Sequence, residues 1–321
     1  MARKPVEIAE LLKDAPTNWG RWGADDQLGS LNFLTSEEVL RGVRSVKQGK
    51  VFMLGVPVAR PEGDPLHPVR SQPIHTMTMD EGFYMNGRAK PFPGGLKFAD
   101  DVITMFPQGT TQYDALGHAW YGDKLYNGHD PKTTMGGLRK CSIQPIAEHG
   151  VVGRGILIDA ARYKGRKHLD RNEGVTLDDL LGAAKKQGTP IEKHDILVLH
   201  TGWLARYYDE GPQAFFPDGK YDEPGLEYSK ELVEWFHDME IASISADTIA
   251  CEQAYHTETG AVAILHCALL RNLGVIFNEI VWLKDLAEDC AKDGQYTFLF
   301  AGAPLKLVYG AGSAVNPTAI K

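Results

Sequence analysis

Hydrophobic positions along this chain follow two alternating periods, and their order predicts an α/β fold. Short apolar runs such as residues 154–160 and 195–203 are rich in Ile, Leu and Val and predict buried strands. Between such runs, apolar residues recur every three or four positions and predict helices. Further strands are predicted within residues 51–58, 101–106, 241–245, 275–280 and 296–308, and helices within residues 35–50, 176–188, 229–239, 261–274 and 283–294. This order of strands and helices indicates an α/β unit without a domain break.

Residues that favour helix ends support two of these helices. Thr35 and Glu38 form a capping-box pattern at the start of the first helix. Thr176 is the predicted N-cap of the second, and Gly188 lies just past its end. These residues predict helices that begin after positions 35 and 176.

Two parts of the N-terminal third depart from the alternating pattern. Residues 1–16 predict a short amphipathic helix, which together with the helix at 35–50 forms a helical extension at about 1–50. Residues 59–100 are rich in Pro and Gly and predict long ordered loops, a kind of segment that often carries function. The expected organisation is a single domain over residues 1–321 that includes this extension.

Charge and composition argue against several classes of partner. The chain has 321 residues, is 43% hydrophobic and carries a formal net charge of −8, whereas nucleic acids and anionic membranes select basic surfaces. No apolar run approaches the roughly 20 residues that span a bilayer, and the N-terminus lacks the apolar core of a secretory signal. The four cysteines form no CxxC pair and predict buried thiols in a reduced, cytoplasmic protein. No GxGxxG or Walker signature follows a predicted strand, which argues against nucleotide binding.

The stretch "QGTTQYDALGHAWYG", residues 108–122, contains polar side chains at even spacing. Asp114 and His118 are four residues apart, so one helical turn would place them on the same side. A carboxylate beside an imidazole can ligate a metal together with it, or can orient the imidazole as a base. The same pair is compatible with a solvated polar turn. Gln108 and Gln112 offer neutral amide oxygens, which suit hard cations better than zinc.

A second polar pair lies far downstream among apolar residues. His266 shares the apolar stripe of its predicted helix with Leu270 and Leu273, and Glu279 emerges from the next predicted strand. Burying such a pair costs free energy unless something satisfies both groups. Taken singly, the two residues fit a core histidine and an edge glutamate. Taken with Asp114, they form a set of one imidazole and two carboxylates that would bind a divalent cation.

The stretch from residue 108 resembles the signature of the cyclase family of metal-dependent hydrolases, which includes kynurenine formamidase, isatin hydrolase and trans-dienelactone hydrolase. The family pattern is His-x-Gly-Thr-His-x-Asp-x-x-x-His, and this chain reads "QGTTQYDALGH" over residues 108–118. The Asp and the last His are retained, whereas both earlier histidines are glutamines and the family glycine is Thr110. "DILVLHTGW", "SADTIACE" and "LHCALLRNLGVIFNEIVWL" resemble later family segments in the same order, so the likeness spans nearly the whole chain. The glutamine variant is similar to the branch nearest trans-dienelactone hydrolase.

The resemblance implies a mainly β core with outer helices, in subunits that assemble as homodimers or homotetramers. Family members with two metals hold the first with the two motif histidines and the Asp, which correspond here to Gln108, Gln112 and Asp114. They hold the second with the same Asp, a downstream His and a downstream Glu, here Asp114, His266 and Glu279. Because the glutamines weaken the first set, one divalent ion, Mn²⁺ or Zn²⁺, is expected in the second.

These assignments favour a metal-dependent hydrolase that opens a small, aromatic-derived lactone or cyclic amide. The resemblance makes His118 the acid/base group, and Gln108 and Gln112 would hold the water or the substrate. The aromatic residues expected in the pocket wall are Trp22, Tyr113, Trp120 and Trp203. The alternatives are an arylformamidase or another amide hydrolase, a lyase that uses His118 without a metal, and a non-catalytic protein that has kept a small-molecule pocket.

Overall fold

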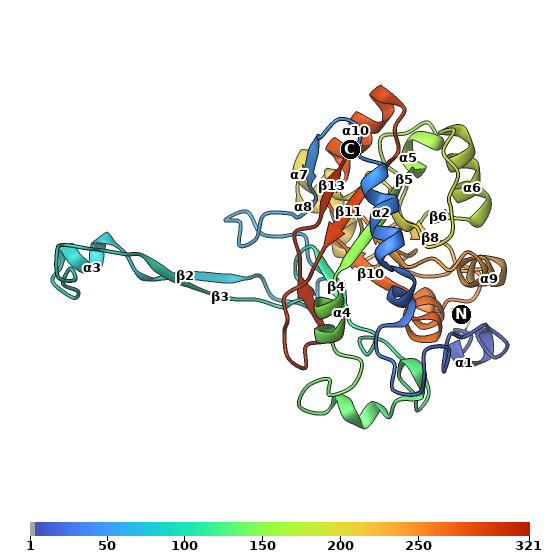
Figure 1. Ribbon diagram of the computed structural model, residues 1–321, viewed down its shortest axis with the longest axis horizontal. Coiled ribbons are helices and arrows are strands. Elements are labelled where there is room, and N and C mark those ends of the chain that lie inside the picture. The colour runs from blue at the N-terminus through green and yellow to red at the C-terminus, as the bar shows by residue number, and fades with distance from the viewer. Residues whose placement is uncertain (1–3) are drawn as a thin grey trace.

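The computed structural model describes residues 4–321, with a curled nine-stranded sheet at its centre (Figure 1). In spatial order the strands are β1 (Val51–Met53), β13 (Thr318–Ile320), β11 (Thr297–Gly302), β5 (Val151–Asp159), β7 (Ile196–His200), β9 (Ser243–Ala246), β10 (Ile276–Glu279), β4 (Gln112–Asp114) and β12 (Gly312–Ala314). The four central strands β5, β7, β9 and β10 are parallel, and the strands on both sides of them pair antiparallel. The predicted α/β fold with a mainly β core is confirmed.

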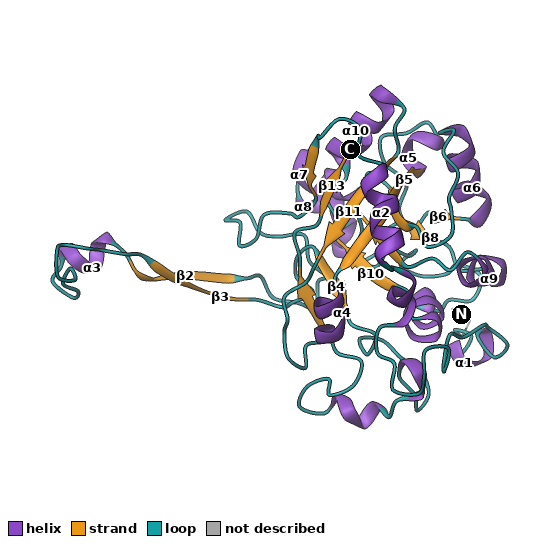
Figure 2. Ribbon diagram, in the orientation of Figure 1, coloured by secondary structure: helices purple, strands orange, loops and turns teal. Residues whose placement is uncertain are grey.

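Helices lie on the outside of this sheet (Figure 2). The α-helices are α1 (Ile8–Leu11), α2 (Ser36–Arg44), α3 (Glu81–Met85), α4 (Ile143–His149), α5 (Ala160–Tyr163), α6 (Leu177–Lys186), α7 (Trp203–Asp209), α8 (Pro212–Phe215), α9 (Lys230–Asp238) and α10 (Lys284–Asp293). Short 3₁₀ turns are η1 (Gly29–Phe33), η2 (Tyr126–Gly128), η3 (Pro131–Thr134) and η4 (Pro217–Gly219), and η5 (His266–Leu273) is a π-helix. No helix in residues 4–321 is long and apolar enough to cross a membrane.

The main hydrophobic core lies where the outer helices cover the central strands. Every residue of β7 is buried, as are nearly all residues of β5. Parallel strands covered on both faces need apolar side chains at consecutive positions, which explains the continuous apolar runs in the sequence. Among residues 4–321 all four cysteines are free and buried, as predicted.

The helix boundaries follow the sequence, with one difference in capping. At α6 the hydroxyl of Thr176 accepts from the backbone N–H of Asp179, whose carboxylate accepts from the N–H of Thr176. The helix α2 also begins after Thr35, but the Thr35 side chain makes no capping hydrogen bond. Its predicted partner, Glu38, instead contacts Nδ1 of His194 at 2.8 Å. A tertiary contact has therefore displaced the local capping box.

At the N-terminus only part of the predicted helix is formed. The helix α1 is a single turn, and residues 1–3 of the predicted extension lie outside the described residues. The segment 59–100 also differs from the predicted loops. It contains strand β2 (Ile74–Met79), which pairs antiparallel with β3 (Asp100–Thr104) in a hairpin that projects far from the sheet (Figure 1). A further small sheet pairs β6 (Gly174–Val175) with β8 (Gly225–Leu226).

Helix α2 packs closely against the sheet at Gly42, and this packing predicts that a larger residue there lowers stability. A Cβ at this position would lie 2.6 Å from the carbonyl carbon and oxygen of Gly153 on β5. We expect Gly42→Ala to lower the free energy of unfolding by about 1–3 kcal/mol through overpacking, although Ala is the better helix former. Urea denaturation measures the change, with Arg44→Ala on the exposed side of α2 as the control. A Gly42→Ala variant as stable as the parent would contradict this packing.

Candidate metal centre

Strand β4 and its neighbour β10 bring three polar side chains to one face of the sheet. Side chains alternate along a strand, so Gln112 and Asp114 point to one side of β4 and Tyr113 to the other. In the register of the two strands, Glu279 lies opposite Gln112. Nε2 of Gln112 donates a hydrogen bond of 2.6 Å to Oε2 of Glu279. Strand pairing therefore places the carboxylates of Asp114 and Glu279 on the same face.

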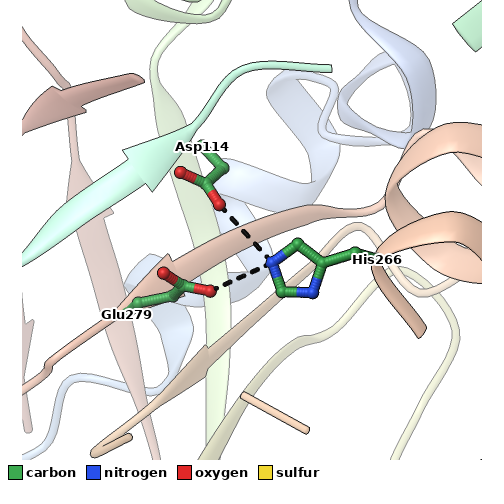
Figure 3. Close-up of side chains that lie close together, drawn as sticks. All are labelled: Asp114, His266 and Glu279. Carbon is green, nitrogen blue, oxygen red and sulfur yellow. Dashed lines mark ion pairs between the residues drawn. The ribbon is translucent and has the colours of Figure 1, made fainter. Parts of the chain in front are cut away.

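His266 completes the group from the first residue of the π-helix η5. Its Nε2 lies 3.4 Å from Oε1 of Glu279 and 3.6 Å from Oδ2 of Asp114 (Figure 3). One ligand atom from each of the three side chains lies within 4.8 Å of the others, and all three residues are buried. The structure thus brings together the three side chains that the sequence proposed as metal ligands.

Three of the four carboxylate oxygens in this group lack a hydrogen-bond donor among the described residues. Both carboxylate oxygens of Asp114 and Oε1 of Glu279 are buried without a hydrogen-bond partner among residues 4–321. Burial, and after it the charge of Asp114, raises the pKa of Glu279 to about 7. Buried charges are costly unless they are paired or coordinate a metal. Free oxygens on two carboxylates, with one imidazole nitrogen facing them, therefore fit a divalent cation.

Glu252 fixes the orientation of His266. Its Oε1 accepts from Nδ1 of His266 at 2.6 Å and from the backbone N–H of the same residue at 2.8 Å. Its Oε2 accepts from the backbone N–H of Leu265 at 2.8 Å. Because Nδ1 is engaged, Nε2 is the nitrogen left to face the two carboxylates, as in the carboxylate–imidazole–metal arrangements of many metal sites. Glu252 was not predicted, since no spacing in the sequence links it to His266.

His118 lies beside the three grouped side chains. It follows β4 in a turn, in which its backbone N–H donates to the carbonyl of Ala115. Its Nε2 lies 3.6 Å from Oδ2 of Asp114, and its side chain remains partly exposed. Burial lowers the pKa of His118 below its usual value, although the charge of Asp114 opposes this shift. A neutral imidazole at this position can accept a proton.

Comparison with known proteins assigns this chain to a family. The family model described as "Putative cyclase" matches residues 54–253. The chain belongs to the cyclase family. A crystal structure described as a novel cyclase is similar to it, with 37% sequence identity and a TM-score of 0.85 over 95% of this chain and 100% of that chain.

Two isatin hydrolase structures resemble this cyclase-family protein at lower identity. Isatin hydrolase A from Ralstonia solanacearum has 18% identity and a TM-score of 0.57, over 84% of this chain and 91% of that chain. An isatin hydrolase bound to the product analogue thioisatinate has 16% identity and a TM-score of 0.58, over 89% of this chain and 98% of that chain. None of the curated proteins compared with the chain matches it. At these identities the isatin hydrolases establish a shared fold.

Two of the three grouped side chains of this cyclase-family protein, His266 and Glu279, line a pocket of about 340 Å³. The polar residues in its wall are His67, Arg70, His118, Tyr221, Glu252, His266 and Glu279. Nη1 of Arg70 donates to the backbone carbonyl of Gln108 at 2.7 Å, which holds the guanidinium near the pocket. His67 and Arg70 belong to the Pro- and Gly-rich segment that the sequence indicated as functional, but no pattern singled them out.

The two glutamines of the motif have different surroundings. Gln112 contacts Glu279, and its Oε1 is buried without a hydrogen-bond partner among residues 4–321. The side chain of Gln108 lies against β12, where a Cβ on Gly312 would be 2.6 Å from Nε2 of Gln108. Gly312 pairs with Asp114 across β12 and β4, so the structure places both glutamines on the Asp114 face of the sheet, Gln112 against Glu279 and Gln108 beside Gly312.

The aromatic residues predicted for the pocket wall lie elsewhere. Tyr113 is fully buried on the opposite face of β4, because side chains alternate along the strand. Trp22 packs edge-on against Phe33. Trp120 is largely exposed, and Trp203 is buried in a separate small hydrophobic cluster. None of these four aromatic residues is among the described residues that line the pocket.

A larger cavity of about 570 Å³ lies at the ends of β5 and β7. In its wall, Nδ1 of His200 lies 2.9 Å from Oδ1 of Asp159. The nearby Asp247 accepts hydrogen bonds from the backbone N–H and the hydroxyl of Thr201 at 2.7 and 2.8 Å. These carboxylates are satisfied by protein donors, in contrast to those of the smaller pocket. The candidate metal centre is therefore the smaller pocket.

Removing the carboxylate that orients His266 is expected to weaken metal binding while keeping all three ligands. Glu252→Gln should lower the affinity for Mn²⁺ or Zn²⁺ by about 10–100-fold, and His266→Ala should abolish tight binding. Calorimetric titration of chelator-stripped protein measures both affinities. The exposed Glu258 provides the control variant Glu258→Gln. If both site variants bound metal like the parent, the assignment of the centre would be wrong.

Proposed function

We propose that this cyclase-family protein is a metal-dependent hydrolase that opens a small lactone or cyclic amide. The observation that carries the proposal is the position of His118, whose Nε2 is 3.6 Å from Asp114 at the pocket that His266 and Glu279 also line. A proton acceptor thus stands beside a set of metal ligands with free oxygens. Metal-assisted hydrolysis of a carbonyl compound needs these components in one pocket.

One divalent ion, held by Asp114, His266 and Glu279, would polarise a carbonyl group and lower the pKa of water from about 15.7 toward 7. Two carboxylates and one imidazole form a hard ligand set, which suits Mn²⁺ at least as well as Zn²⁺. A single ion is proposed because Gln112 directs its amide nitrogen at Glu279, and because both motif histidines are replaced by neutral amides in Gln108 and Gln112. The family's first set of ligands is therefore weakened in this chain.

His118 performs the proton transfers in this proposal. Its Nε2 takes a proton from the water whose oxygen attacks the carbonyl carbon. The ring C–O or C–N bond then breaks, and the same proton passes to the leaving oxygen or nitrogen. Gln112 supports the first step, because its buried and unpartnered Oε1 can accept a hydrogen bond from the water.

The pocket supports a small substrate with an anionic group. A volume of about 340 Å³ lies within the range typical of small-molecule sites. Arg70 brings a guanidinium to the wall, and this group forms strong hydrogen bonds with carboxylates. The isatin hydrolases are named for isatin, which is an aromatic cyclic amide. Their shared fold with this chain supports a cyclic amide as one class of substrate for the proposed hydrolase.

Elemental analysis of the purified protein joined to a hydrolysis screen tests the proposal. The screen covers lactones, isatin-like lactams and aryl formamides, each with parent protein and with protein stripped of metal by a chelator. Hydrolysis that is lost on stripping and regained with Mn²⁺ or Zn²⁺ is the expected result. Metal-free protein that binds small aromatic acids without turning over any compound would instead indicate a binding protein.

Because His118 is proposed to transfer protons and not to bind the metal, its replacement should affect activity without affecting metal binding. His118→Ala should lower the hydrolysis rate by about 10²- to 10⁴-fold, the usual contribution of a general acid/base group. Its metal content should stay close to that of the parent. The exposed His149 supplies the control variant His149→Ala. Loss of metal from His118→Ala would make His118 a ligand, and full activity would remove it from the mechanism.

Histidine substitution of the two glutamines tests the weakened first set of ligands. Gln112→His should raise the metal content above one ion per subunit and lower turnover, because an imidazole joins Asp114 while the water-holding amide is lost. Gln112→His combined with Gln108→His should raise the metal content further, since the side chain of Gln108 lies beside Gly312, the strand partner of Asp114. Elemental analysis and rates at saturating metal measure both variants. An unchanged metal content in Gln112→His would mean that one residue does not rebuild the first set.

A further inference from the structure

The pocket at the candidate metal centre is also lined by side chains that donate hydrogen bonds. His67 and Arg70 come from the segment before β2, and Tyr221 comes from the segment between η4 and β8. All three are partly buried. Nη1 of Arg70 is engaged with the carbonyl of Gln108. In contrast, no hydrogen bond within residues 4–321 involves Nε2 of His67 or the hydroxyl of Tyr221, so both groups are free to meet a molecule in the pocket.

His67 carries its proton on the nitrogen that has no partner. Its Nδ1 accepts a hydrogen bond of 3.3 Å from the backbone N–H of Val69, so in the neutral ring the proton is on Nε2. Burial, and after it the charge of Arg70, lowers the pKa of His67. The ring also lies edge-on to Tyr221, with 4.8 Å between the ring centroids. His67 is therefore a neutral N–H donor whose ring is held on two sides.

Tyr221 supplies an O–H donor near the metal centre. Burial raises its pKa well above the ordinary value, and the charges of Glu223, Glu279 and Glu252 add to this shift. Because the charges of Glu279 and Glu252 reach it, the hydroxyl lies near the group that these carboxylates form with His266. The hydroxyl therefore keeps its proton at neutral pH and is available as a donor.

We propose that Nε2–H of His67 and the O–H of Tyr221 form an oxyanion-binding pair for the substrate carbonyl, an inference that rests on the proposed hydrolase function. As the water oxygen bonds to the carbonyl carbon and His118 takes the water proton, the π electron pair of the C=O bond moves onto the carbonyl oxygen. Hydrogen bonds from the two neutral donors strengthen as this charge grows, so they stabilise the transition state more than the substrate. When the ring C–O or C–N bond breaks, the electron pair re-forms the C=O bond.

The glutamines of the motif make side-chain donors more important in this chain. In two-ion sites, separate ions can stabilise the attacking and the leaving oxygens. With neutral amides at Gln108 and Gln112, one ion is proposed, so the developing oxyanion depends more on donors from the protein. Tyrosine and histidine are both residue types that serve in oxyanion holes.

Steady-state kinetics on the compound that the parent hydrolyses fastest tests the pair. Tyr221→Phe removes only the hydroxyl and should lower kcat by about 10²- to 10³-fold, the usual effect of losing one oxyanion donor, with KM and metal content unchanged. His67→Leu should act similarly, and His67→Gln, which restores an N–H donor, should recover part of the rate. Tyr309→Phe is the matched control, because Tyr309 is 51% exposed.

Two kinetic outcomes would overturn the proposal. One is a kcat like that of the parent in both Tyr221→Phe and His67→Leu. The other is a raised KM with unchanged kcat, because that pattern marks groups that bind the substrate and its transition state equally.

A tetrahedral anion gives a readout that does not depend on turnover. Phenylphosphonate resembles the tetrahedral intermediate in shape and charge, whereas benzoate carries a planar anionic group on the same ring. In calorimetric titrations of Zn²⁺-loaded protein, Tyr221→Phe and His67→Leu should each lose about 10-fold in affinity for phenylphosphonate, as expected for one hydrogen bond to a charged group, and much less for benzoate. Equal losses for the two anions, or no loss, would overturn the proposal.

The two measurements separate this inference from the proposed function. A parent that hydrolyses none of the screened compounds would contradict the hydrolase function, and the phosphonate titration would still decide whether the two donors bind an oxyanion. A parent that hydrolyses a lactone or lactam, with both variants equally active, would contradict the donor pair alone.

Discussion

The two buried carboxylates that face one imidazole set the constraint on which the rest of the site depends. Asp114 and Glu279 carry like charges in a space without protein hydrogen-bond donors for three of their four oxygens. Moving each such charge from water into the protein interior costs roughly several kcal/mol, unless an opposite charge lies close to it. His266 alone contributes at most one positive charge, and it is already engaged with Glu252. A bound divalent cation would balance the charges of this set.

Several elements cooperate to hold this unfavourable group in place. Pairing of β4 with β10 fixes the two carboxylates, and Glu252 fixes the imidazole. The far end of η5 is held by the N-terminal segment. The hydroxyl of Ser30 donates to the carbonyl of Leu273, and the backbone N–H of Ser30 donates to the carbonyl of Gly274, both at 2.9 Å. The segment before α2 therefore supplies donors for carbonyls at the end of η5, which have no partner within the helix. Through these hydrogen bonds the segment around Ser30 helps to hold the helix that begins with His266.

The projecting hairpin of β2 and β3, called the arm below, is linked to the candidate metal centre through the backbone. His67 and Arg70, in the pocket wall, precede the arm by a few residues, and the segment that leaves the arm runs directly into β4 with Asp114. The hydrogen bond from Arg70 to the carbonyl of Gln108 joins these two segments at the base of the arm.

Local sequence determined the type of most elements and the choice of candidate metal ligands. Continuous apolar runs marked the parallel strands, because strands buried on both faces take mostly apolar side chains. Asp114, His266 and Glu279 could be selected because their residue types and the family pattern point to metal binding. Thr176 and Asp179 formed the cap at α6 because both partners are neighbours in the chain.

Tertiary structure decided what depends on contacts between distant segments. Glu252 reaches His266, and Glu38 turns from its predicted cap to His194, through packing that no sequence spacing encodes. Strand alternation could have shown that Tyr113 points away from Asp114, but only once β4 was known to be a strand. The strand β2 was missed because its apolar residues have no core to pack against, and core packing produces the periodic pattern from which strands are predicted. Position along the chain fixes hydrogen bonds between neighbours, whereas the direction of a side chain toward a remote partner is fixed only when the sheet and its covering helices are assembled.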